Sequence, residues 1–109
     1  MSNLDNLIDE GFTALGNKKR RDMLLTLSFR PATVTQLAKE TNLTLPAIHK
    51  HIRILENSNL IDRRKVGRTN FVTLNNGSLK TLQDWIMQYR TEWGSNKETL
   101  DNYIASLRY

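Results

Sequence analysis

The chain has 109 residues, a formal net charge of +5 and an apolar fraction of 39%, which together indicate one compact globular domain. It contains no cysteine, so disulfide bonds and thiolate metal sites are excluded. No apolar run approaches the roughly 18 residues of a membrane span, and the first residues carry neither a basic segment nor a continuous apolar stretch. We therefore expect no membrane partner, no secretory signal and a cytoplasmic location.

The positive charge is concentrated in the middle of the sequence. Residues 17–68 carry twelve Lys or Arg against four Asp or Glu, whereas residues 1–16 are acidic and residues 69–109 are balanced. Such a basic region attracts polyanions such as nucleic acid. The alternative is a solvated basic surface, which many globular proteins have. The nucleic-acid interpretation is favoured because the charge coincides with the motifs described below.

Two amphipathic helices are predicted at the start of the chain. Apolar residues recur at helical spacing over residues 4–15, Gly16 ends this helix, and Asn17 can cap the next one. The second helix opens with four cations at residues 18–21, although cations at a helix N-terminus oppose the helix dipole. This arrangement indicates either that the charges act outside their own helix or that the first turn is merely solvated.

Residues 33–57 predict two short helices joined by a turn. Val34, Leu37 and Ala38 give the first helix an apolar side, and residues 41–44 supply the turn. Thr44 is the natural N-cap of the second helix. Pro46 in its first turn costs no hydrogen bond, because the first N–H groups of a helix have no partner within it.

The second of these helices has two contrasting faces. Ile48, Ile52 and Leu55 fall on one side at about 100° per residue, and the opposite side is polar and cationic. We expect the early positions to meet base edges, with Lys50 donating to guanine and Leu45 packing on a thymine methyl. The alternative is an ordinary amphipathic surface helix. The candidate DNA-binding residues are Thr44, Leu45, Pro46, His49, Lys50 and, for a phosphate, Arg53.

A basic β-hairpin follows. Residues 60–66 and 69–74 predict two strands, and Gly67-Arg68 predicts the tight turn between them. Cations at such a tip neutralise phosphates or enter the minor groove. The alternative is that they protect a sheet edge from aggregation. The candidate DNA-binding residues here are Arg63, Arg64, Lys65 and Arg68.

The C-terminal part predicts a turn at residues 75–78 and two further amphipathic helices, with a break at Gly94-Ser95. Their large apolar residues indicate a subunit interface rather than only an internal core. A small effector pocket at that interface is an alternative that the pattern leaves open. The candidate dimer-interface residues are Leu4, Leu7, Ile8, Trp85, Tyr89, Trp93, Leu100, Tyr103, Ile104 and Leu107.

Catalysis and metal binding have little support in the sequence. His49 and His51 point about 160° apart on a helix, so they cannot share one ion. No cysteine nucleophile, glycine-rich phosphate loop, HExxH pattern or paired-acid motif is present. We expect no enzymatic activity, no cofactor and no metal site.

The predicted order is helix, helix, helix, helix, strand, strand, helix, helix, a mainly α fold with a small β-hairpin. A helix-turn-helix that continues into a basic hairpin is the arrangement of a winged helix. Residues 12–109 resemble the ArsR/SmtB-type winged-helix repressors. Segments 14–24, 43–61 and 66–68 carry the likeness, with His51 at the position where the family usually has a histidine.

The resemblance implies a sequence-specific transcription regulator. It implies a homodimeric repressor that binds double-stranded DNA at an inverted-repeat operator. It implies one domain over residues 1–109, whose first and last helices form the dimer interface. Because cysteine is absent throughout and histidine is absent from residues 78–109, the likeness is to the subset without a recognised metal site. It names no small-molecule effector. The alternatives are a protein–protein interaction module on a degenerate winged helix and a less specific RNA or nucleic-acid binder.

Overall fold

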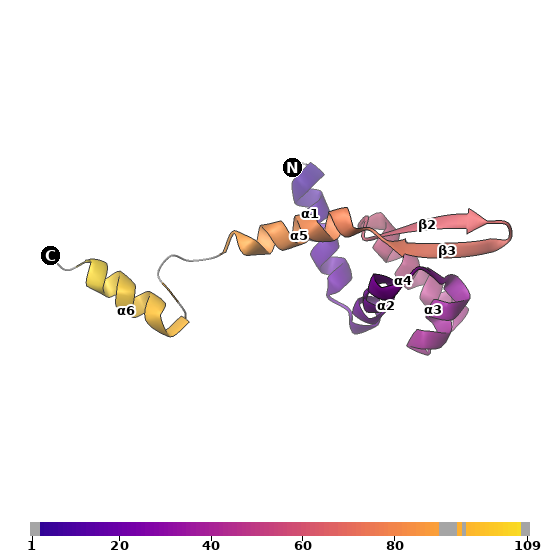
Figure 1. Cartoon of the computed structure of the whole chain (residues 1–109), viewed down its shortest axis with the longest axis horizontal. Coiled ribbons are helices and arrows are strands. Elements are labelled where there is room, and N and C mark those ends of the chain that lie inside the picture. The colour runs from indigo at the N-terminus through magenta and orange to yellow at the C-terminus, as the bar shows by residue number, and fades with distance from the viewer. Residues whose placement is uncertain (1–2, 90–93, 95, 108–109) are drawn as a thin grey trace.

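The computed structural model of the chain describes residues 3–89, 94 and 96–107. The part described is mainly helical with one small antiparallel sheet, which confirms the predicted fold class (Figure 1). The helices are α1 (Asn3–Leu15), α2 (Lys18–Phe29), α3 (Val34–Thr41), α4 (Leu45–Asn57), α5 (Asn76–Met87) and α6 (Asn96–Ser106). The strands are β1 (Ala32–Thr33), β2 (Ile61–Val66) and β3 (Thr69–Leu74).

Capping residues predicted from the sequence begin α2 and α4 and end α3. The Asn17 side chain accepts the N–H of Arg20 at the start of α2, and the Thr44 hydroxyl accepts the N–H of Ala47 at the start of α4. Asn42 ends α3 in the left-handed conformation, with φ of 57°. These side chains satisfy backbone groups that the helices themselves leave without partners.

The sheet has one more strand than predicted. The two-residue strand β1 pairs with β3, so that the order is β1-β3-β2 and the hairpin is joined to the segment before α3. Pro31 ends the preceding helical segment and favours an extended chain, but a two-residue strand has no periodicity of its own. Its pairing with β3 depends on the tertiary structure.

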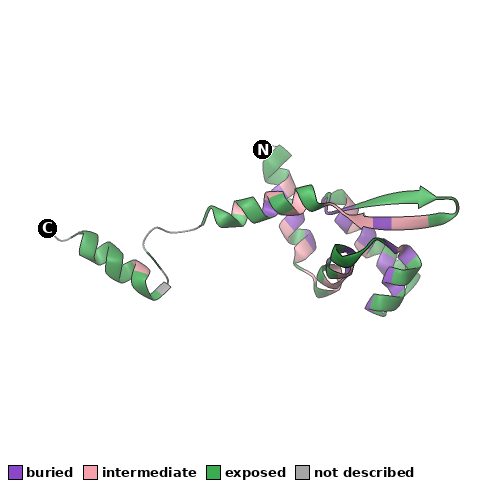
Figure 2. Cartoon of the chain, in the orientation of Figure 1, coloured by how far each residue is buried: buried purple, intermediate pink, exposed green. Residues whose placement is uncertain are grey.

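The core lies where the helix-turn-helix meets the sheet (Figure 2). Met23, Leu37, Ile48, Ile52 and Leu55 are fully buried, and each belongs to an apolar side that the sequence predicts. From the sheet, the buried residues are Ala32, Ile61 and Val72. Burial on this scale supplies most of the free energy that holds a domain of this size together.

The predicted C-terminal half is corrected at two places. Residues 75–78 are not a separate turn: Asn75 is an N-cap whose side chain accepts the N–H of Ser78, and α5 begins directly at Asn76. The helix then ends at Met87 rather than continuing toward Trp93. Trp93 itself lies outside the residues that the structure describes.

Helices α1 and α5 pack closely through a glycine. Gly11 is buried, and a Cβ placed on it would lie 2.8 Å from both methyl carbons of Leu82. Nearby, the rings of Phe12 and Trp85 are 5.2 Å apart, and Trp85 in turn contacts Tyr89 with centroids 4.9 Å apart. The small residue therefore lets the two helices approach.

Within the described residues, no helix has both the length and the apolar character needed to cross a membrane.

Candidate nucleic-acid interface

Helix α4, hereafter the recognition helix, presents a cationic face opposite its buried side. Ile48, Ile52 and Leu55 have no exposed surface, so the helix cannot rotate about its axis without uncovering core. This fixes which residues face solvent. All six residues that the sequence predicts for DNA contact on this helix are exposed: the N-cap Thr44, Leu45, Pro46, His49, Lys50 and Arg53. Asn57, at the C-terminal end of the helix, is exposed as well.

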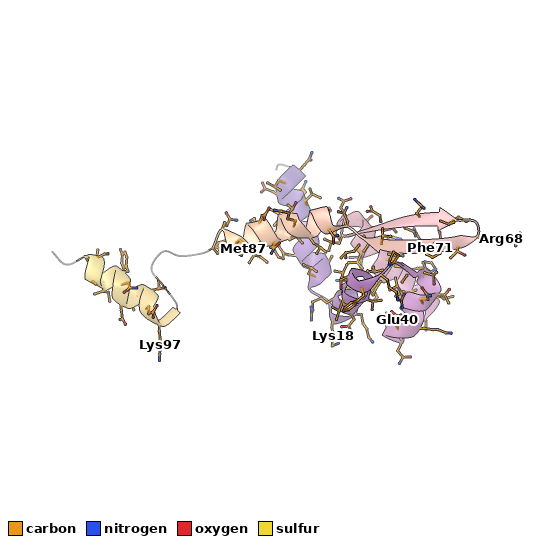
Figure 3. The ribbon with its side chains drawn as sticks, in the orientation of Figure 1. Lys18, Glu40, Arg68, Phe71, Met87 and Lys97 are labelled. Atoms are coloured by element: carbon orange, nitrogen blue, oxygen red, sulfur yellow. The ribbon has the colours of Figure 1, made fainter. Side chains whose placement is uncertain are left out.

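The β2–β3 hairpin, hereafter the wing, extends away from the helices and carries Arg68 at its far end (Figure 3). Val66 pairs with Thr69, so the turn consists of Gly67 and Arg68. Gly67 has φ of 63°, a left-handed conformation that favours glycine and suits a type II′ hairpin turn. The side chains of Arg64, Lys65 and Arg68 are exposed.

One wing cation is tied to the recognition helix. Arg63 Nη2 lies 3.1 Å from Glu56 Oε1 near the C-terminal end of α4, and both side chains are about one-third exposed. The carboxylate of Glu56 therefore partly neutralises the charge of Arg63. Among the described residues, Arg64, Lys65 and Arg68 form no ion pair, so they are the wing cations most available to phosphate.

A groove of about 290 Å³ lies between the recognition helix and the wing tip. Leu45 and His49 line it from the helix, and Arg68 lines it from the wing. The groove thus brings together residues that the sequence predicted from two separate motifs. It also adds residues that the sequence analysis missed: Thr33, Val34, Thr35, Thr69 and Asn70.

A family model, a curated relative and solved structures match this chain. The family model described as "Bacterial regulatory protein, arsR family" matches residues 17–63, which span α2 to the start of the wing. An uncharacterized HTH-type transcriptional regulator, YuzN of Bacillus subtilis (strain 168), is 34% identical over 86 residues, which are 72% of this chain and 94% of that protein. The chain belongs to the ArsR family of bacterial regulatory proteins.

Solved structures support the same fold. A crystal structure of an ArsR family transcriptional regulator is 32% identical, with a TM-score of 0.70, and the match covers 84% of this chain and 100% of that one. A homodimeric winged helix-turn-helix DNA-binding domain from Mycobacterium bovis is 17% identical, with a TM-score of 0.67 and coverage of 81% and 87%. The resemblance found in the sequence is confirmed. This ArsR-family chain is a DNA-binding transcriptional regulator with a winged helix.

The cations at the start of α2 join neighbouring helices of this ArsR-family fold. Arg20 Nε donates to the carbonyl of Ala14 at 2.7 Å, and Arg21 Nη1 donates to that of Leu15 at 2.8 Å. Lys19 Nζ donates to the carbonyl of Thr41 at 2.7 Å. These carbonyls lie at the C-terminal ends of α1 and α3, where the helix dipole favours cations. Three of the four charges therefore act outside their own helix, one of the two interpretations that the sequence left open, whereas Lys18 pairs with Asp22 of α2 itself and is solvated.

His51 lies on the side of the recognition helix that faces Arg20. Its Nδ1 is 3.3 Å from Arg20 Nη1. Burial lowers the pKa of His51 from its ordinary value of 6.5, and the positive charges of Arg20 and Lys50 lower it further. His49, by contrast, is exposed on the groove. In the part of the chain that is described, no three His, Asp or Glu side chains gather in a way that could hold a metal ion.

The residues predicted for the dimer interface are placed in two groups. Ile8 is buried in the core of the single chain, and Trp85 packs against Phe12 beside that core. Ile8 therefore has little surface left for a second subunit. Leu7 is half-buried. The other predicted interface residues that the structure describes are exposed: Leu4, Tyr89, Leu100, Tyr103, Ile104 and Leu107.

Proposed function

We propose that this ArsR-family chain is a homodimeric repressor that binds an inverted-repeat operator through its recognition helix and its wing. The observation that carries the proposal is the shared groove, which places Leu45 and His49 of the helix beside Arg68 of the wing. In a winged helix the recognition helix enters the major groove, while the wing follows the phosphates or the minor groove. One continuous surface can therefore contact both parts of a duplex.

In this proposal the early residues of the recognition helix read base edges. Lys50 is exposed, and an ammonium group there can donate to the O6 and N7 acceptors of guanine. Leu45 is 50% exposed although it is a large apolar residue, and it can pack on a thymine methyl group. Pro46 and His49 lie on the same face. Arg53 lies about two turns beyond Leu45 along the helix, and we assign it to a phosphate contact.

The wing contributes affinity more than sequence preference. Arg64, Lys65 and Arg68 can neutralise phosphates, and each such contact releases a counterion from the duplex. Arg63 is assigned mainly a positioning role, because it already pairs with Glu56. This division refines the expectation from the sequence, in which the four wing cations were equivalent.

The dimer is supported by apolar surface that the single chain leaves uncovered. Leu100, Tyr103 and Ile104 on α6, and Leu107 directly after it, recur at helical spacing, and each is at least 40% exposed. An isolated helix of 11 residues is only marginally stable in water, so α6 needs a surface to pack on. The exposed Leu4 on α1 offers part of such a surface in a second copy. The homodimeric domain from Mycobacterium bovis, which shares the fold, lends further support.

The proposal includes no metal and no catalytic step. Soft metals such as cadmium, copper(I) and arsenite bind thiolates, and the chain has no cysteine. The two histidines lie on different sides of the recognition helix, one exposed on the groove and one against Arg20. They are therefore assigned to DNA contact and to packing respectively.

Selection of bound sequences from a pool of random duplex DNA tests the proposed function. We expect enrichment of one motif with two-fold symmetry, whose half-sites lie about 10 bp apart, because two recognition helices in a symmetric dimer enter successive turns of the major groove. A pool that shows no enrichment over the starting library would contradict sequence-specific binding. A single asymmetric half-site would contradict the dimer.

A further inference from the structure

Arg20 connects the end of α1 to the recognition helix. Its Nε donates to the carbonyl of Ala14 at 2.7 Å, and its Nη2 donates to that of Thr13 at 3.3 Å. The remaining nitrogen, Nη1, lies 3.3 Å from Nδ1 of His51 on α4. Arg20 is thus held by two backbone carbonyls on one side, and it contacts a titratable side chain on the other.

The contact specifies the protonation state of His51. A guanidinium group has five N–H donors and no acceptor, so Nδ1 of His51 must accept the hydrogen bond. An imidazole can accept at Nδ1 only when it is neutral and carries its proton on Nε2. Protonation of Nδ1 removes the acceptor and places a second positive charge beside Arg20.

We propose that neutral His51 holds the recognition helix in its DNA-binding position through Arg20, and that protonation of His51 releases this contact and weakens operator binding in acid. The inference rests on the proposed function, because it assigns DNA contact to α4. It makes Arg20 and His51 positioning residues, which act through the helix and not by touching DNA.

The charges around His51 favour this response. Arg20 faces the ring from α2, Lys50 adjoins it on α4, and both oppose a positive charge on the imidazole. The carboxylates on the neighbouring elements either form ion pairs with other cations or lie beside other residues of α4. Glu56 of α4 pairs with Arg63 of β2, Glu40 of α3 pairs with Arg30, Asp22 of α2 pairs with Lys18, and Asp9 and Glu10 of α1 lie beside Ile54 and Asn57 further along α4.

The histidine is the partner that must move when the ring is charged. The guanidinium group of Arg20 donates to the carbonyls of Ala14 and Thr13, and the backbone N–H of Arg20 donates to Oδ1 of Asn17. Arg20 is therefore held in place. Lys50 and His49, two of the residues proposed to contact DNA, directly precede His51 in the chain. A small shift of this turn therefore displaces the reading face.

The direction of the pH effect follows from linkage. The packed His51 has a pKa below 6.5, whereas a released His51 returns toward that value. Release therefore takes up a proton, and the competent form loses population as the pH falls below about 6.5. One proton per subunit limits the change to about tenfold per pH unit for each subunit.

The test compares operator affinity at pH 7.5 and pH 5.5 for the wild type, His51→Gln and His49→Gln, by fluorescence anisotropy on the selected duplex. Glutamine at position 51 can accept from Arg20 through Oε1 but does not titrate in this range. We expect the wild type to lose on the order of threefold to tenfold in affinity at pH 5.5. His49→Gln is weaker at both pH values because His49 is proposed to contact DNA, and its fall between the two pH values should be at least as large as that of the wild type. We expect His51→Gln to match the wild type at pH 7.5 and to change by less than about twofold.

Two results would overturn the proposal: wild-type affinity that does not fall between the two pH values, or an equal fall in His51→Gln. Far-UV circular dichroism and the thermal midpoint at each pH separate release of the helix from unfolding. If His51→Gln does not fold, His51→Asn supplies a shorter acceptor for the same comparison. Failure of the wild type to bind any duplex specifically at pH 7.5 would instead contradict the proposed function.

Discussion

Arg63 on β2 and Glu56 on α4 form an ion pair, with Nη2 and Oε1 separated by 3.1 Å, that joins the base of the wing to the recognition helix. The two elements proposed to contact DNA are therefore coupled by a side-chain pair as well as by their shared core. Arg64 and Arg68 lie on the same wing, and no such pair is found for them among the described residues.

A double-mutant cycle tests this coupling. We expect Glu56→Gln and Arg63→Gln to be non-additive in DNA affinity, with a coupling free energy of about 0.5 kcal/mol, because the pair is partly exposed and partly screened by water. The control cycle of Glu56→Gln with Arg64→Gln has no ion pair to break and should be additive. Equal coupling in the two cycles would contradict a specific positioning role for Arg63.

A side chain at Gly11 requires Leu82 to move, because a Cβ there would lie 2.8 Å from the Leu82 methyl carbons. Gly11→Val should lower the free energy of unfolding by about 1–3 kcal/mol, the usual cost of overpacking a core. Gly77→Ala is a matched control, since Gly77 lies in the exposed first turn of α5 and its Cβ would be 3.4 Å from the nearest atom. That change should stabilise by up to about 1 kcal/mol through helix propensity. Urea unfolding measures both, and an unchanged stability in Gly11→Val would contradict the packing described.

If α6 lies in the dimer interface, an aspartate should affect dimerisation differently at two leucines of nearly equal exposure. Leu100 on α6 is 62% exposed and Leu25 on α2 is 61% exposed in the single chain. A charge buried in an apolar interface is costly, so Leu100→Asp should shift the protein toward monomer at micromolar concentration. Leu25→Asp, which is outside the proposed interface, should remain dimeric. Sedimentation equilibrium distinguishes the two. A wild type that sediments as a 12.6 kDa monomer, with and without DNA, would contradict the dimer.

Operator affinity is expected to be independent of added metal. The chain lacks cysteine, and zinc sites in proteins take several nitrogen, sulfur or carboxylate ligands that must converge. Anisotropy titrations with zinc, cadmium, copper(I) and arsenite, each repeated with a chelator, measure this. A loss of affinity at low micromolar metal that the chelator reverses would contradict the expectation, and it would direct attention to carboxylates near Asp84.

The recognition helix and the wing were predictable because their signals are local. Thr44 caps α4, Ile48 and Ile52 fix its buried side, and Gly67 marks the hairpin turn. Each signal depends on neighbours within one or two turns of chain. Composition and spacing therefore suffice to define these elements and the side chains that they expose.

The remaining features depend on contacts between distant parts of the chain. The strand β1 forms only because Ala32 pairs with Val72, and Arg20 meets His51 across 31 residues. Ile8 resembles an interface residue in the sequence because an apolar stripe on a helix looks the same whether it faces the core or a second subunit. The end of α5 at Met87 was also missed, since the apolar spacing continues beyond it.

If α4 reads sequence while the wing supplies affinity, Lys50→Ala and Arg68→Ala must differ in how they bind a selected duplex and a scrambled one. Their affinities for both duplexes, measured over a range of salt concentrations, test this division. We expect Lys50→Ala to cost about 1–3 kcal/mol of binding free energy on the selected duplex and much less on the scrambled one. We expect Arg68→Ala to weaken binding to both duplexes similarly and to reduce the slope of log affinity against log salt by about one unit. Equal losses on the two duplexes for Lys50→Ala would contradict the reading of bases by α4.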